Sequence, residues 1–202
     1  MKPILFDNKM VQAILEGIKK ETRRPIKPQP TGEPQFEYEG HIGFFDADGR
    51  RLNPPYKLGE LLYVREAWLK EDDRIYYRAD GYPDLRMHNE EDIKWRPSIH
   101  MPKEYARIFL EVDYIAMQKI SQVTEIMAED EGFYGAWVMN YDFTEEYYTT
   151  ARATFRKKWQ EHYSKGPYSL SADPWVWVIG FKYLSKLGSY KEAERSERRM
   201  RK

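Results

Sequence analysis

The chain has 202 residues, and its 33 lysines and arginines are balanced by 33 aspartates and glutamates, so any affinity for a polyanion has to come from local patches. A hydrophobic content of 41%, with 15% aromatic residues, excludes disorder throughout the chain, and the length favours one domain. Because there is no cysteine, disulfides, thiolate metal ligands and cysteine nucleophiles are excluded. The apolar runs are too short for a signal peptide or a membrane-spanning helix, so we expect a cytoplasmic protein with no membrane partner.

The N-terminal segment predicts a strand followed by a helix. A short apolar strand at 4–6 meets the N-cap candidates Asp7 and Asn8, after which apolar residues recur at helical spacing. Gly17 is suited to end the helix and three prolines prevent a restart, so residues 18–30 are expected as loop or extended chain. The basic cluster EGIKKETRRPIKPQP, in which cations surround one threonine, is therefore expected on a helix-exit loop.

The middle of the chain predicts an insertion and several strands. Residues 31–58 are rich in glycine, proline and polar groups and are interpreted as an insertion, with a small hairpin that turns at Asp48 and Gly49. The segment at about 80–104 shows no hydrophobic period. Strands are expected from their β-branched and aromatic content at 59–68, 74–80 and 106–120.

The C-terminal part predicts two helices, a buried strand and a basic tail. A short helix should begin after Thr124 and end near Gly132, and a longer one should span 143–163. Residues 174–184 are apolar on both faces and are expected as an inner strand beside the N-terminal strand. The tail at 186–202 contains seven cations and three glutamates and is expected as a frayed, solvated helix.

These elements lack the regular alternation of strands and helices that is typical of a parallel sheet. We therefore expect an α+β fold, a mixed or antiparallel β-barrel with flanking helices and inserted loops. The expected organisation is a single domain at 1–185 followed by the basic tail.

Several motifs resemble those of one family. Gly17, Lys19 and Arg24 form the pattern G-x-K-x-x-x-x-R, which resembles the signature of the ASCH domain, a branch of the PUA-like superfamily. GELLYVREAW and VTEIMAEDEGF resemble the strand and helix that follow in that family. The order of WRPSIHMP, ARIFLEV and PWVWVIGF is similar to that of longer ASCH-like proteins of phages and prophages, so the resemblance spans about 2–184.

The resemblance implies a PUA-like barrel with a basic cleft that faces RNA, a nucleotide or a modified nucleoside. The cleft would be lined by the 17–27 loop, the 60–68 strand and the 124–132 helix. Some small bacterial members are amidohydrolases of N4-acetylcytidine, and their working residues match Lys19, Thr22 and Glu131 here. Other members are RNA-binding proteins or ribonucleases, so the resemblance leaves the activity open.

The chemistry of this trio has definite requirements. A threonine hydroxyl needs a base, and Lys19 could act as one only if burial or a neighbouring cation lowers its pKa. Glu131 would then protonate the leaving amine. In a fully extended segment Lys19 and Thr22 point to opposite faces, so the chain has to turn between them. The alternative is that Lys19 is a solvated surface lysine and Thr22 a turn residue.

A second set of residues is expected to bind the nucleotide. Cations near the signature would neutralise phosphates, and an aromatic ring would stack on a base. In the alternative interpretation Arg65 or Glu66 forms a buried ion pair and Trp68 belongs to the core. The set comprises Gly17, Lys20, Arg23, Arg24, Lys27, Arg65, Glu66 and Trp68.

Neither a metal site nor a cofactor is predicted. The four histidines show no metal-ligand spacing, and no glycine-rich phosphate loop occurs. Two further alternatives remain: a divalent-ion ribonuclease using Glu125, Glu129 and Glu131, and a protein-interaction module whose tail binds a partner.

Overall fold

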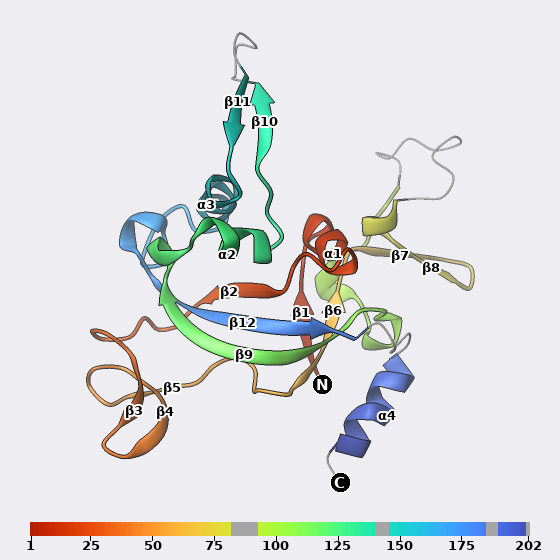
Figure 1. The fold of residues 1–202 in the computed structure, drawn as a ribbon. Coiled ribbons are helices and arrows are strands. Elements are labelled where there is room, and N and C mark those ends of the chain that lie inside the picture. The colour runs from red at the N-terminus through yellow and green to blue at the C-terminus, as the bar shows by residue number, and fades with distance from the viewer. Residues whose placement is uncertain (82–92, 140–145, 185–189, 201–202) are drawn as a thin grey trace. The chain divides into compact units, whose positions relative to one another are not determined.

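The computed structural model describes residues 1–81, 93–139, 146–184 and 190–200 (Figure 1). These residues form an α+β structure with mixed and antiparallel sheets. Its α-helices are α1 (Asn8–Leu15), α2 (Glu125–Asp130), α3 (Ala151–His162) and α4 (Tyr190–Met200). None of the helices in the described part of the chain has the length and apolar character needed to span a bilayer.

The main sheet has five strands. In spatial order they are β1 (Lys2–Leu5), β6 (Leu61–Arg65), β9 (Phe109–Lys119), β12 (Trp175–Tyr183) and β2 (Glu21–Pro25). The pairing of β1 with β6 is parallel, whereas β6 pairs with β9 and β12 with β2 in antiparallel fashion. Among the described strands this order has β1 and β2 at its ends and forms no closed barrel.

The expected neighbour of the 174–184 strand is wrong. The segment does form a strand, β12, but its partner is β2, and β6 and β9 separate it from β1 in the sheet order. The reason is that β12 has β9 on one side and β2 on the other, so both of its edges are already paired.

Three smaller sheets accompany the main one. They are β3 (Gln35–Tyr38), β4 (His41–Phe45) and β5 (Arg51–Leu52); β7 (Trp68–Glu71) and β8 (Arg74–Tyr77); and β10 (Ala136–Met139) and β11 (Glu146–Thr149). The predicted hairpin is confirmed, because Asp48 and Gly49 connect β4 to β5 and Gly49 has a φ of 75°. Part of the segment without a hydrophobic period, 82–92, lies outside the described residues, and its described remainder contains short 3-10 helices.

The described chain divides into two compact units. The first comprises Met1–Lys20, Leu58–Asp113 and Phe181–Lys202, and the second comprises Glu21–Lys57 and Tyr114–Gly180. Strands β9 and β12 each contribute residues to both units. Each unit has its own hydrophobic cluster.

The cluster of the first unit includes a residue of α4. Ala193 is fully buried with aromatic residues such as Tyr63 and Trp68, and the amino group of Met1 lies 2.5 Å from the Glu197 carboxylate. The expectation of a frayed, solvated tail is therefore wrong for α4, because this helix buries one of its faces.

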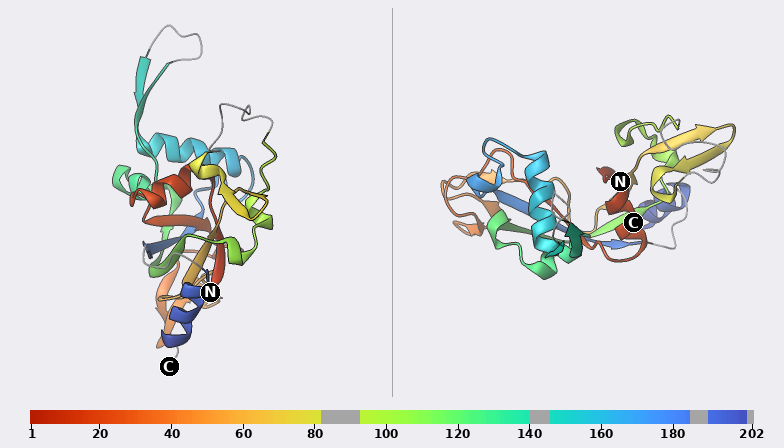
Figure 2. Two further views of the ribbon diagram at one scale, coloured as in Figure 1. Left: turned by 90° about the vertical axis from the view of Figure 1, so that its right-hand side faces the viewer. Right: turned by 90° about the horizontal axis from the view of Figure 1, so that it is seen from above.

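In the second unit β12 and β2 are covered on both faces (Figures 1 and 2). Val176 packs with Phe155 and Trp159 of α3. The next residue, Trp177, meets Phe44 of β4 with ring centroids 5.0 Å apart. Because successive strand residues point to opposite faces, α2 and α3 cover one face and the β3–β5 sheet covers the other.

The predicted 143–163 helix is too long. Residues 146–149 form β11, and the helix α3 begins only after Thr150, whose side chain accepts a hydrogen bond from Ala153 N. The threonine N-cap and the antiparallel pairing of β11 with β10 fix this boundary.

Candidate functional site

The signature segment leaves α1 as expected. Gly17 has a φ of 75°, and its N–H donates to the Ile14 carbonyl at 3.0 Å. Lys19 follows and is only 3% exposed, with its Nζ 5.1 Å from the centroid of the Phe6 ring. Lys19 is therefore buried, unlike the solvated surface lysine of the alternative interpretation.

The basic cluster lies on a strand and not on a helix-exit loop. Residues 21–25 form β2, in which Glu21 pairs with Gly180 and Arg23 with Val178 of β12. The register is continuous, so side chains alternate between the two faces. Glu21 and Arg23 therefore face α2, whereas Thr22 faces the opposite side.

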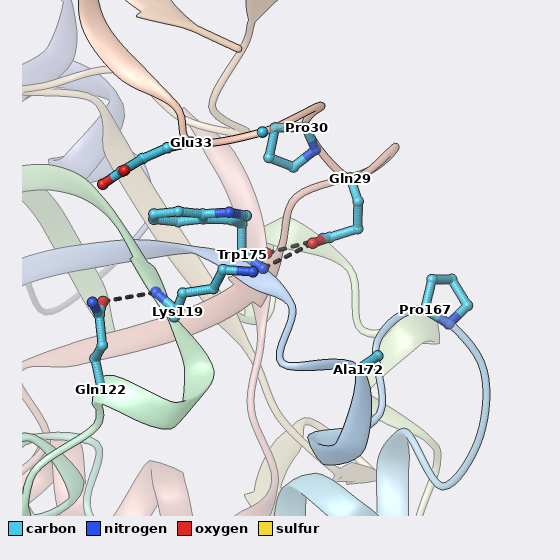
Figure 3. A pocket seen from close by; sticks show the side chains of 9 residues that line it. Gln29, Pro30, Glu33, Lys119, Gln122, Pro167, Ala172 and Trp175 are labelled. Atoms are coloured by element: carbon cyan, nitrogen blue, oxygen red, sulfur yellow. Dashed lines mark hydrogen bonds between the residues drawn. The ribbon is translucent and has the colours of Figure 1, made fainter. Parts of the chain in front are cut away.

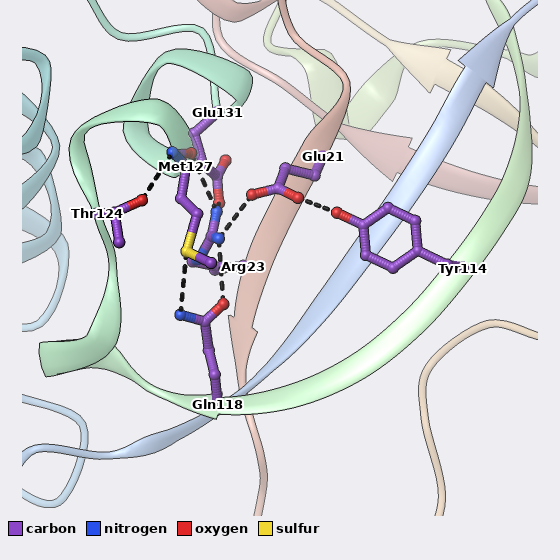
Figure 4. Close-up of polar contacts among 7 residues, drawn as sticks. All are labelled: Glu21, Arg23, Tyr114, Gln118, Thr124, Met127 and Glu131. Atoms are coloured by element: carbon purple, nitrogen blue, oxygen red, sulfur yellow. Dashed lines mark hydrogen bonds and ion pairs between the residues drawn. The ribbon is translucent and has the colours of Figure 1, made fainter.

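Arg23 is the centre of a buried polar cluster (Figure 4). Its Nη2 lies 2.6 Å from Glu21 Oε1 and donates to Gln118 Oε1 at 3.1 Å. Its Nη1 donates to Glu131 Oε1 at 3.3 Å and to the Met127 carbonyl at 3.4 Å. All three charged residues are at most 5% exposed, so one buried cation is shared by two buried carboxylates.

Tyr114 extends this cluster across the sheet. It projects from β9 over Gly180 of β12, and its hydroxyl donates to the Glu21 carboxylate on β2 (Figure 4). A Cβ at position 180 would come within 1.9 Å of the Tyr114 ring, so the Tyr114 side chain can cross β12 here only because residue 180 is glycine. Burial and the hydrogen bond to Glu21 raise the pKa of Tyr114 above its ordinary value.

The helix α2 positions Glu131 as predicted. Thr124 is its N-cap and accepts a hydrogen bond from Met127 N at 3.3 Å. Glu131 is the C-cap residue, and Gly132, with a φ of 87°, ends the helix. A six-residue helix with a cap at each end thus presents one carboxylate to Arg23.

Glu125 on the same helix has a structural task. Its carboxylate accepts the N–H groups of Ala151 and Arg152 at 2.6 Å and 3.1 Å, which caps α3. Burial acts to raise its pKa, but these hydrogen bonds outweigh that effect and lower it. Among the described residues no group of three metal-ligating side chains is placed to hold a metal ion.

The three residues of the proposed trio lie in two units. Thr22 and Glu131 belong to the second unit and are 3% and 2% exposed, whereas Lys19 belongs to the first. Strand alternation separates Thr22 from the face on which Arg23 contacts Glu131. The convergence of all three on one substrate stays a prediction.

The expected phosphate-binding cations differ in exposure. Lys20 and Lys27 are exposed and Arg24 is half-buried, whereas Arg23 is buried and engaged with carboxylates. The Nζ of Lys27 lies 5.0 Å from the centroid of the Tyr168 ring. Phosphate contacts in this segment would therefore fall to the exposed lysines.

In the first unit Glu66 forms a buried ion pair. It is fully buried, and its two oxygens accept hydrogen bonds from Nε and Nη2 of Arg107, both at 2.9 Å. Arg107 also binds Asp80 and lies 3.9 Å from the Tyr77 ring centroid. The interpretation of one inward, paired charge in this strand is confirmed for Glu66.

Arg65 and Trp68 complete the predicted set. Arg65 is half-buried and donates from Nη1 to the Ile99 carbonyl at 3.3 Å. Trp68 is 3% exposed and packs in the first unit's cluster, with the Arg96 guanidinium 5.0 Å from its ring centroid. Trp68 is therefore a core residue.

The pKa values of Glu66, Tyr77 and Arg107 are shifted from their ordinary values. Burial raises the pKa of Glu66, although Arg107 opposes the shift. Burial also raises the pKa of Tyr77 to about 12. For Arg107 burial acts to lower the pKa, but its hydrogen bonds to Glu66 and Asp80 outweigh it and raise the value.

A separate pocket of about 650 Å³ lies in the second unit (Figure 3). Gln29 joins its walls, because its side chain both donates to and accepts from the main chain of Trp175, at 3.0 Å and 2.8 Å. Lys119 donates from Nζ to the Asp173 carbonyl at 2.9 Å and lies over the Trp175 ring. The side chains of Gln29 and Lys119 are therefore already engaged with the main chain.

Sequence reasoning missed three contributors to the candidate site: Tyr114, Gln118 and Gly180. The period of two in the 106–120 strand places positions 114 and 118 on one face, but nothing in that pattern indicates a charged partner. Gly180, inside an otherwise apolar strand, was the available signal, because such a glycine marks a close approach of another group.

Comparison of the chain with protein-family models, with curated proteins and with solved structures finds no match.

Proposed function

We propose that the chain is an ASCH-type protein with a PUA-like fold that binds RNA or a modified nucleoside or nucleotide at the Arg23 cluster of the second unit. One observation carries this proposal. Eight polar or charged side chains are buried in the described chain, and three of them, Glu21, Arg23 and Glu131 of the second unit, contact one another. Burying charge is costly, and such concentrations are typical of functional sites.

The available groups suit the edge of a nucleobase. Carboxylates and the Gln118 amide oxygen accept hydrogen bonds, and the Arg23 guanidinium donates them. The buried Nε–H of Arg23 makes no hydrogen bond to any residue that the structure describes. A base carrying both donors and acceptors could replace part of this internal pairing.

Calorimetric titration with nucleosides, N4-acetylcytidine, mononucleotides and short single-stranded RNAs tests the proposal. We expect Glu131→Gln to weaken binding about tenfold or more, because a hydrogen bond to a charged group contributes about 1.5–3 kcal/mol. Glu129→Gln is the matched control, since Glu129 is exposed on the same helix. If the unmodified chain binds no member of the panel, or both variants lose affinity equally, the proposal is wrong.

A second candidate is the amidohydrolase activity. The burial of Lys19 favours it, because a catalytic lysine needs a desolvated amine. The alternation in β2, which directs Thr22 away from Glu131, weighs against it. Turnover of N4-acetylcytidine that falls to background in both Lys19→Ala and Thr22→Ala would support hydrolysis, and absence of turnover in the unmodified chain would exclude it for this substrate.

A further inference from the structure

The helix α4 carries a stripe of cations on one side. Lys191, Arg195, Arg198 and Arg199 are exposed, and their positions i, i+4, i+7 and i+8 lie within an arc of about 100° on the helix. Ala193 lies nearly opposite this arc and is fully buried. The stripe is therefore the outward face of a helix whose other face packs against the first unit.

Contacts on the inner face hold the stripe in place. Ala193 packs among the aromatic residues of the first unit, and Glu197 accepts the ion pair from the amino group of Met1 at 2.5 Å. A stripe on an anchored helix presents its charges in a fixed row, so binding a partner needs less ordering than it would on a flexible tail.

Among the residues that the structure describes, most of these cations have no acidic partner. Arg198 lies 3.5 Å from Glu194, an exposed pair of small energetic weight. Lys191, Arg195 and Arg199 form no ion pair with any residue in the described part of the chain. A row of four cations on a chain with no net charge is the local patch that its composition requires for a polyanion.

The side chains indicate which polyanion fits. Three of the four are arginines, whose planar guanidinium binds phosphate oxygens in bidentate fashion. The stripe contains no aromatic or aliphatic residue that could enter a bilayer, so an anionic membrane is disfavoured.

We infer that α4 binds the phosphate backbone of a polynucleotide through Lys191, Arg195, Arg198 and Arg199. This inference rests on the proposed function and deepens it, because it makes the ligand a polynucleotide and not a free nucleoside or nucleotide. The helix then supplies affinity without reading sequence.

Salt-dependent binding of a labelled single-stranded RNA of about 15 nucleotides, followed by fluorescence anisotropy, tests the inference. For the double variant Arg195→Gln/Arg199→Gln we expect the slope of the logarithm of the association constant against log salt to become less negative by about 1.4. This change corresponds to about 25-fold weaker binding at roughly 0.1 M salt. The control is Arg156→Gln/Lys157→Gln, an equally exposed pair on α3. An unchanged thermal midpoint shows that both variants fold.

Three outcomes would overturn the inference: an unchanged slope, an equal loss in the α3 control, or competition by polyglutamate as strong as that by RNA. Mononucleotide binding separates the two proposals. If mononucleotides bind but the α4 variant retains full RNA affinity, the inference fails and the proposed function stands. If RNA binding depends on α4 but no nucleoside or mononucleotide binds, the base site fails and the stripe stands.

Discussion

Replacing Arg23 with alanine would leave the carboxylates of Glu21 and Glu131 buried without the guanidinium that contacts both. Breaking such a buried pair typically costs about 3–5 kcal/mol, so we expect a loss of this size in the free energy of unfolding measured with urea. Arg24→Ala changes the same residue type on the opposite face of β2, and we expect it to cost about 1 kcal/mol. Equal losses would show that the buried carboxylates do not depend on Arg23.

Gly180 and Tyr114 should be energetically coupled. A Cβ at position 180 would lie 1.9 Å from the Tyr114 ring, so Gly180→Ala should displace the ring and destabilise the chain by about 1–3 kcal/mol. In a background of Tyr114→Ala the same change should cost about 1 kcal/mol less. A double-mutant cycle from urea unfolding measures this coupling, and strict additivity would contradict the close packing.

The raised pKa of Glu66 predicts a pH dependence of stability. The folded chain holds the proton of the Glu66 carboxyl more tightly than the unfolded chain does. The contribution of this proton to the free energy of unfolding is therefore fully present below the ordinary pKa of 4.5, and it is lost as pH rises through the folded-state pKa. The difference in unfolding free energy between the unmodified chain and Glu66→Gln should therefore decrease as pH rises above about 4.5. A difference that does not change with pH would contradict this prediction.

At the scale of elements, the caps of two helices offer a matched comparison. Thr124→Ala and Thr150→Ala each remove one N-cap side chain and should each cost about 1 kcal/mol. Only α2 carries Glu131, so Thr124→Ala should also weaken nucleotide binding, whereas Thr150→Ala should leave it unchanged. Thermal unfolding and calorimetric titration measure the two effects, and equal effects on binding would contradict the role of α2.

Elements with local signals were predictable from the sequence. Thr124 and Gly132 marked both ends of α2, and Asp48 with Gly49 marked the hairpin. The strand β2 was harder to predict because Arg23 is an unusual residue for a buried strand. Its burial depends on Glu131, which lies more than a hundred residues away in the sequence, and no local pattern encodes that contact.

The contacts of the candidate site were also not predictable from local sequence patterns. The resemblance identified Glu131 as a functional candidate. The charge of the basic cluster identified Arg23, but as a ligand of phosphate and not as the partner of two carboxylates. The helix α4 was predicted, but the packing of Ala193 was not, because a small residue in a charged segment gives no hydrophobic period.

At the scale of the whole molecule, the two units share β9 and β12, so we expect them to unfold together. Amide hydrogen exchange in mild denaturant should give similar opening free energies for Val64 in β6 and Thr22 in β2, which belong to different units. Two well-separated values would show that the units unfold independently and would contradict the prediction of a single domain.

The pairing of β2 with β12 has a consequence for the order in which the chain is made. Arg23 leaves the ribosome long before Val178, its partner in the sheet, and Glu131 emerges between them. Until β12 is synthesised, the charges of β2 can remain in water without cost. The candidate site is therefore among the last parts to assemble during translation, and a nascent chain that stops before Trp175 cannot form it.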